Sequence, residues 1–208
     1  ANGDNPRHGL WVWDGTPDGF EFLKAFPTFD SDYSQIPRHF TELNGKLLFT
    51  MSDGVSGNEW WSSDGTVAGT VLMADINPGA AHASPAVPVK HGDRLYFFAD
   101  DVAHGRQLWR TDGSASGTQR LTLMSGLSDP YLGPIVPVGD SVVFFARIGA
   151  TQTLLFALDS SAPEGCVALS SQSFSTGGEA VSSGERAFFT YPTLHGIWTT
   201  DGTPDGTN

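Results

Sequence analysis

One short motif recurs along the chain and constrains the fold more than any other feature. An aromatic residue stands three positions before an Asp, and the four best copies continue with Gly, a hydroxyl residue and a further Gly. These copies read LWVWDGTPDG from Leu10, EWWSSDGTVAGT from Glu59, QLWRTDGSASGT from Gln107 and GIWTTDGTPDGT from Gly196, and a decayed copy, LLFALDSSAPEG, starts at Leu154. The repeated aromatic and acidic residues are Trp11, Asp14, Trp61, Asp64, Trp109, Asp112, Phe156, Asp159, Trp198 and Asp201.

A second motif keeps the same period of roughly 40–50 residues. It reads NGKLLFTM from Asn44, GDRLYFFA from Gly92, GDSVVFFA from Gly139 and GERAFFTY from Gly184. Each copy opens with a Gly-containing pair suited to a two-residue hairpin turn and continues with strand-forming residues. Each period therefore predicts four short strands, which we call a, b, c and d in chain order. The sequence predicts an all-β fold, a β-propeller built of four-stranded antiparallel blades with about four blades present.

The repeats divide the chain into units without separate domains. We expect one propeller segment over residues 1–208, with units at about 1–26 (partial, strands c and d), 38–76, 85–124, 133–170 and 178–208 (partial, strands a to c). The strands do not add up to whole blades, which favours a part of a larger propeller. A compact ring of four or five blades is the alternative.

The neighbouring residues Trp60 and Trp61 test whether successive blades pack face to face. Successive side chains of a strand point to opposite faces of the sheet, so the two indoles point in opposite directions. A single blade cannot cover both of its faces. We therefore expect each indole to pack against a different neighbouring blade.

These residues resemble the bacterial E-L-W-x-x-D-G-T repeat proteins, and the resemblance covers nearly the whole chain. The motif's Glu is present at Glu59 but is replaced by Gln107, Gly9, Leu154 and Gly196 in the other copies. The resemblance implies a β-propeller that is secreted or attached to the cell surface, and it assigns no activity.

The Asp-Gly-Thr segment joins strands c and d, and we interpret it as a structural turn. Asp side chains accept hydrogen bonds from backbone N–H groups two residues on, and Gly takes the positive φ that follows. The turn resembles the Asp-box turns of sialidase-type propellers. Calcium needs six to eight oxygen ligands, whereas this turn supplies one carboxylate and a hydroxyl. We therefore predict no catalytic residue, no bound metal and no cofactor, with calcium as the weaker alternative.

Before strand c, His-Gly pairs occur at His8, His104 and His195. We expect them to form b–c turns in which Gly has a positive φ. The alternative is a ring of imidazoles on one face of the propeller.

The d–a connections are longer and differ from one another, and variable loops on a rigid scaffold often carry function. The candidate ligand-binding residues in them are Asp30, Asp32, Tyr33, His82, Asp129 and Tyr131. Aromatic rings with carboxylates are suited to sugars. The alternative is a set of solvated acidic loops.

The chain carries a net charge of −12 and has a pI of about 4.6, which disfavours nucleic acid and anionic membranes as partners. No apolar run is long enough to span a membrane. Cys166 is the only cysteine, so no intrachain disulfide can form.

We therefore predict a non-catalytic, secreted or cell-surface module that binds or scaffolds protein or carbohydrate partners, its ring completed by other blades or subunits. One alternative is a propeller-fold enzyme of glycoside hydrolase or lyase type, with its site in the d–a loops or in blades that are not present. Two or more perturbed carboxylates, or a His, converging at the central channel would favour this enzyme. A structural subunit of a larger extracellular assembly is the other alternative, and a large apolar face would favour it.

Overall fold

The computed structural model describes residues 9–25, 36–121, 133–148, 152–159, 166–171, 173–174, 179–191 and 194–208, and these form an all-β fold. The first hairpin is β1 (Gly9–Trp13) and β2 (Phe20–Ala25). The second sheet is β3 (Arg38–Leu43), β4 (Lys46–Ser52), β5 (Asn58–Ser63) and β6 (Val71–Ala74). The third sheet is β7 (Ala86–His91), β8 (Arg94–Asp101), β9 (Gly105–Thr111) and β10 (Gln119–Arg120).

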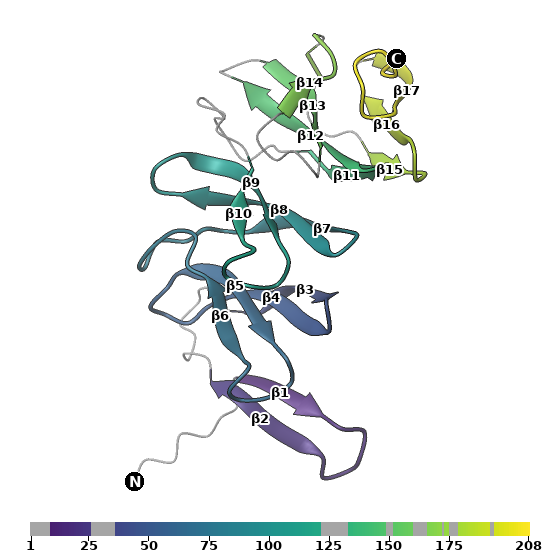
Figure 1. Ribbon diagram of the computed structural model, residues 1–208. Coiled ribbons are helices and arrows are strands. Elements are labelled where there is room, and N and C mark those ends of the chain that lie inside the picture. Colours follow the sequence, from purple (N-terminus) through teal and green to yellow (C-terminus); the bar gives the residue numbers. More distant parts are fainter. Residues whose placement is uncertain are drawn as a thin grey trace.

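Two further sheets complete the described part. The fourth sheet contains β11 (Ile135–Val138), β12 (Ser141–Ile148), β13 (Gln152–Asp159) and β14 (Cys166–Ala168). The fifth contains β15 (Ala180–Ser182), β16 (Ala187–Tyr191) and β17 (Leu194–Thr200). Each sheet is antiparallel with its strands in chain order. The prediction of an all-β fold with several four-stranded antiparallel sheets is confirmed, and the described sheets form an open row rather than a closed ring (Figure 1).

Tight turns set the register between the first two strands of a sheet. Leu43 pairs with Lys46 across the turn at Asn44 and Gly45, and both turn residues have positive φ, at 52° and 77°. That geometry matches the right-handed twist of the flanking strands, which is why Asn-Gly is favoured there.

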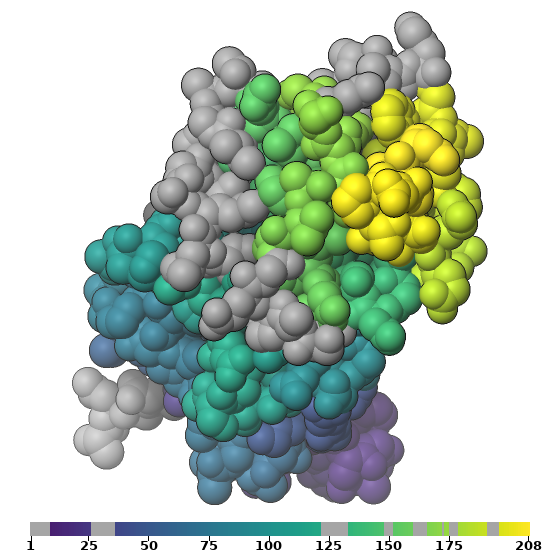
Figure 2. All heavy atoms as spheres, turned by 45° about the horizontal axis from the view of Figure 1, so that its top comes forward, coloured from purple at the N-terminus to yellow at the C-terminus, as the bar shows by residue number. Residues whose placement is uncertain are grey.

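The sheets stack face to face, with β3, β7, β11 and β15 next to one another in sequence order. Figure 2 shows the sheets following one another in chain order from purple to yellow. Trp60 lies in a buried cluster with Phe97 of the third sheet, whereas Trp61 packs with Leu10 of the first hairpin. The predicted division of the two indoles between different neighbours is confirmed.

The repeated aromatic of strand c has the same environment in successive sheets. Trp61, Trp109, Phe156 and Trp198 each pack against the sheet that precedes their own. The residue just before each of them faces the following sheet, as Trp60, Leu108 and Leu155 do. Stacking therefore buries both faces of the internal sheets.

The Asp-Gly-Thr turn is held by its own side chains. Asp64 Oδ1 accepts hydrogen bonds from the Thr66 N–H at 2.9 Å and from the Thr66 hydroxyl at 2.7 Å. A Cβ on Gly69 would lie 2.0 Å from Asp64 Oδ1, so only glycine fits at that position. The same contacts recur at Asp112 and Asp201, so these carboxylates are occupied in holding the turn.

Candidate functional site

The connection between β6 and β7 and the turn between β8 and β9 meet at one end of the second and third sheets. The Asp100 N–H donates to the Ala83 carbonyl at 2.8 Å, and the Asn58 N–H donates to His82 Nδ1 at 2.9 Å. Arg106 contacts both the Ser84 carbonyl, at 3.3 Å, and Asp100 Oδ2, at 2.8 Å. These contacts join the two sheets along one surface, which we call the loop face.

An Asp–His–Arg cluster lies on the loop face of the third sheet. Asp101 ends β8, His104 closes the turn that follows, and Arg120 ends β10. His104 Nδ1 lies 2.8 Å from Asp101 Oδ1, and Arg120 Nη1 lies 2.7 Å from Asp101 Oδ2. Arg120 also contacts His104 Nδ1. The carboxylate side chain is 10% exposed and the imidazole 39%, so a buried anion holds a ring that solvent can reach.

Asp101 is ionised in this arrangement. Burial on its own would raise the pKa of Asp101, but the hydrogen bonds from Arg120 and His104 outweigh burial and hold the pKa below its ordinary value. We assign the imidazole proton to Nδ1 because the charged Asp101 Oδ1 lies 2.8 Å away as its acceptor, although the contact with Arg120 favours the other tautomer. Nε2 is then unprotonated and can accept a proton.

A second polar cluster lies on the loop face of the second sheet. Glu59 is fully buried, and its Oε1 accepts the Asn77 N–H at 2.8 Å. The Asn77 side-chain amide donates to the His82 carbonyl at 2.9 Å. Glu59 Oε2 and Asn77 Oδ1 are buried and have no hydrogen-bond partner among the described residues.

Glu59 is the carboxyl with the most altered acidity in the described part. Burial raises the pKa of Glu59 to about 8, although the N–H groups of Asn77 and Ile76 oppose the rise; the charge of Asp75 adds to it. Glu59 is therefore mostly protonated at neutral pH, and a protonated buried carboxyl can donate a proton.

His82 is the predicted site residue that the structure describes, and it lies on the loop face. Its Nδ1 accepts the Asn58 N–H, so the ring carries its proton on Nε2 and presents a donor to solvent. The other predicted ligand-binding residues lie outside the described residues, and they are Asp30, Asp32, Tyr33, Asp129 and Tyr131.

The His-Gly turns differ among the repeats. Gly105 has a φ of +67°, and Gly57 takes +68° at the equivalent place, as the turn interpretation expects. Gly9 and Gly196 do not have positive φ, so the turn interpretation does not hold at these two glycines. His8 and the side chain of His195 lie outside the described part of the structure.

Sequence reasoning missed Asp101 and Arg120, and it noted His104 as part of a turn or of a ring of imidazoles rather than as a base. A usable signal was present: an Asp at the end of a strand b, three residues before a His, followed by an Arg in the next strand d of a strongly acidic chain. No group of three or more His, Cys, Asp or Glu side chains able to hold a metal occurs among the described residues.

Comparison with known proteins identifies the type of fold. No protein-family model matches the sequence, and no curated protein is similar to it. A puromycin hydrolase structure aligns with a TM-score of 0.53 at 17% identity, over 88% of this chain and 29% of that chain. A Mycobacterium tuberculosis puromycin-hydrolyzing peptidase aligns with a TM-score of 0.52 at 15% identity, over 91% and 30%. A Xanthomonas campestris gluconolactonase aligns with a TM-score of 0.50 at 14% identity, over 95% and 66%.

These likenesses show a propeller-like fold. The chain spans less than a third of the length of the two hydrolases. Because the solved structures that share the fold include enzymes, the preferred prediction of a non-catalytic binding or scaffolding module is wrong, and the enzyme alternative is better supported. In the described part no helix is long and apolar enough to cross a membrane.

Proposed function

We propose that this chain belongs to a propeller-fold hydrolase whose loop face activates water for attack on an acyl carbon. The observation that carries the proposal is the Asp101–His104 pair, in which a largely buried carboxylate lies 2.8 Å from Nδ1 of an accessible imidazole. A general base oriented by a second group is the arrangement that hydrolytic sites use.

The pair supports a water-activating step with a defined proton path. Nε2 of His104 accepts a proton from water as the water oxygen bonds to the acyl carbon. The imidazolium is stabilised by Asp101 and returns the proton to the leaving group as the acyl bond breaks. Esters, lactones and amides are the substrate classes that this step requires.

This geometry favours acyl hydrolysis over the glycoside hydrolase or lyase chemistry of the original alternative. Glycoside hydrolases use two carboxyl groups facing one another across the scissile bond. On the loop face, the Asp101 carboxylate is occupied by His104 and Arg120, and Glu59 is fully buried.

The test is turnover of p-nitrophenyl acetate, an aliphatic lactone and an aminoacyl p-nitroanilide by the purified chain and its variants. We expect hydrolysis of at least one substrate, with a loss of about 10²–10⁴-fold in kcat/KM for His104→Ala and for Asp101→Asn. His91→Ala is the matched control, because His91 lies at the β7–β8 turn beside Tyr96, away from the cluster. The proposal is wrong if no substrate is turned over, or if His91→Ala lowers the rate as much as His104→Ala.

A further inference from the structure

The b–c turns of the second and third sheets are built in the same way. In the third sheet, Asp101 Oδ1 accepts the N–H groups of Ala103 at 2.9 Å and of His104 at 2.6 Å. In the second sheet, Asp53 Oδ1 accepts the Ser56 N–H at 2.7 Å, three residues on as in the third sheet. The Asp is therefore a shared structural feature of these turns, and the two turns can be compared position by position.

Two of the positions that differ between the turns are joined by a hydrogen bond in the third sheet. This sheet has His104 where the second has Ser56, and Gln107 where the second has Glu59. Gln107 is 1% exposed, and its side-chain amide donates to the His104 carbonyl at 3.0 Å. A neutral amide has two N–H donors, whereas an ionised carboxylate has none. The turn that carries the imidazole is therefore the one with a buried amide as donor.

Side chains hold both backbone polar groups of His104. Asp101 accepts its N–H, and Gln107 donates to its carbonyl. The imidazole itself is bound to Asp101, with Nδ1 at 2.8 Å from Oδ1. A displacement of about 1 Å can cost about 10²-fold in rate, so the two backbone anchors affect how well Nε2 is aimed at the attacking water.

We propose that Gln107 is a positioning residue, which orients the His104 ring by holding the His104 carbonyl. This inference rests on the proposed function, because the ring that Gln107 orients is the base assigned to the hydrolytic step. The Gln107 side chain is buried and does not itself touch a substrate. Its loss is therefore expected to lower kcat and to leave KM nearly unchanged.

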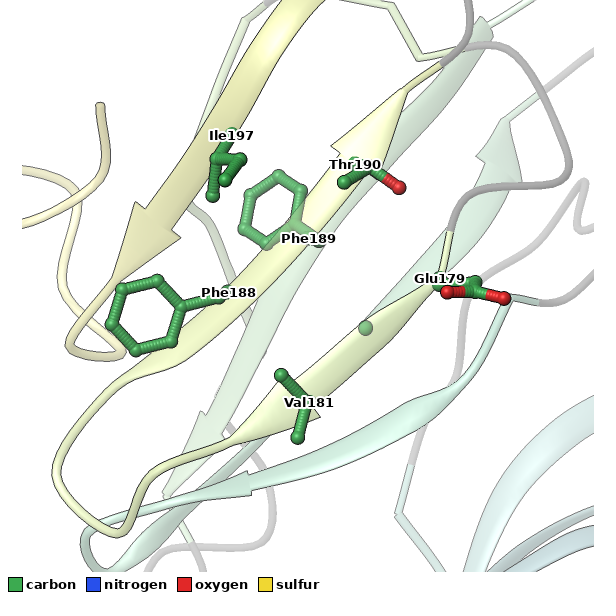
Figure 3. A pocket seen from close by; sticks show the side chains of 7 residues that line it. Glu179, Val181, Phe188, Phe189, Thr190 and Ile197 are labelled. Atoms are coloured by element: carbon green, nitrogen blue, oxygen red, sulfur yellow. The ribbon is translucent and has the colours of Figure 1, made fainter.

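A hollow of about 240 Å³ on the fifth sheet is an alternative location for hydrolysis. Val181, Phe188, Thr190 and Ile197 line it, with Glu179 at its rim (Figure 3). Among the described residues that line the hollow, Glu179 is the only titratable one, so the hollow lacks the pair of base and orienting carboxylate found on the loop face. Glu179→Gln is therefore a control for hydrolysis that takes place away from His104.

Gln107→Met tests the role of the amide, because Met has nearly the same length and cannot donate a hydrogen bond. For the substrate that wild type hydrolyses fastest, kcat is expected to fall about 10-fold or more, with KM within about 2-fold of wild type. Gln119→Met is the matched control in the same sheet, because Gln119 is exposed and its amide oxygen accepts from Arg110. Gln119→Met and Glu179→Gln are both expected to keep the wild-type kcat.

Gln107→Glu is expected to restore the donor only while the introduced carboxyl is protonated. Burial raises the pKa of Glu59, at the equivalent position of the second sheet, to about 8. The kcat of Gln107→Glu relative to wild type is therefore expected to be within about 3-fold at pH 7 and to fall about 10-fold further by pH 9. Gln107→Met is expected to show the same deficit at both pH values, which separates hydrogen-bond donation from side-chain size.

Long-range ¹H–¹⁵N correlation spectra of the His104 ring test the same role without a substrate. The ring signals are expected to be sharp in wild type and in Gln119→Met, and broadened by ring motion in Gln107→Met.

Two results would overturn the proposal. The first is a Gln107→Met protein that is folded by near-UV circular dichroism and has the wild-type kcat and the wild-type His104 spectrum. The second is a Gln107→Glu rate that keeps a constant ratio to wild type between pH 7 and pH 9, and this variant carries the test if Gln107→Met does not fold. If wild type hydrolyses no substrate, the hydrolase proposal fails, and the His104 spectra alone decide whether Gln107 orients the ring.

Discussion

Replacing Glu59 with Gln tests whether its buried carboxyl is protonated in the folded protein. Burial raises the pKa of Glu59 from 4.5 to about 8. Above pH 4.5 the unfolded chain releases this proton while the folded chain keeps it, so the free energy of unfolding falls as the pH rises towards 8. At about 1.4 kcal/mol for each pH unit, this single group removes about 2–4 kcal/mol of stability by pH 7.5.

Gln is neutral at every pH and keeps an oxygen that can accept the Asn77 N–H. We therefore expect Glu59→Gln to be more stable than wild type by about 2–4 kcal/mol at pH 7.5, and to match wild type within about 1 kcal/mol at pH 4.5. The assay is urea unfolding followed by tryptophan fluorescence at the two pH values.

Glu42→Gln is the matched control, because the pKa of Glu42 is shifted in the direction opposite to that of Glu59. Hydrogen bonds from Lys90 and from the Gly45 N–H hold the pKa of the exposed Glu42 below its ordinary value. The ionised Glu42 stabilises the fold at pH values above the pKa that Glu42 has in the unfolded chain, and this stabilisation is lost as the pH falls. Glu42→Gln is therefore not expected to be more stable than wild type at pH 7.5. The reasoning is refuted if Glu59→Gln is less stable than wild type at pH 7.5, or if its difference from wild type is the same at both pH values.

Three further predictions follow from packing and acidity. Gly69→Ala places a Cβ 2.0 Å from a carboxylate oxygen and should lower the free energy of unfolding by more than about 2 kcal/mol, whereas Gly196→Ala adds a Cβ in open space and should change it by less than about 1 kcal/mol in urea unfolding. Trp60→Ala empties a fully buried site and should lower the free energy of unfolding by about 3–5 kcal/mol. Val71→Ala, at a 46% exposed site, should lower it by less than about 1 kcal/mol, and equal losses would contradict the packing. Burial raises the pKa of the Cys166 thiol from 9.0 to about 11, so iodoacetamide at pH 8 should alkylate it about 100-fold more slowly than a free thiol, and equal rates would contradict that assignment.

Features that depend on neighbours in sequence could be predicted from it. The alternation of Trp60 and Trp61 and the Asn-Gly turn are local properties, and the structure shows both. The constant Gly after each Asp was visible in the sequence, but its cause was not. The cause is that, in the folded chain, the Asp64 carboxylate occupies the space where a Cβ on Gly69 would lie.

The candidate site could not be predicted because distant residues form it. Asp101 meets Arg120 only when β8, β9 and β10 pair, and Glu59 gains its raised pKa only when the chain near Asn77 folds over it. The resemblance to E-L-W-x-x-D-G-T proteins stays a prediction. A repeat resemblance does not fix function, so the sequence could not choose between a binding module and an enzyme.

The protonation of the His104 ring tests the proposed chemistry most directly, because Asp101 and Arg120 both lie against Nδ1 and favour opposite tautomers. Long-range ¹H–¹⁵N correlation spectra at neutral pH distinguish the two ring nitrogens. We predict that Nδ1 carries the proton and Nε2 is the free acceptor, with the signal lost in His104→Ala. A proton on Nε2, with Nδ1 accepting from Arg120, would leave the ring without a base facing solvent and would contradict the proposed role of His104.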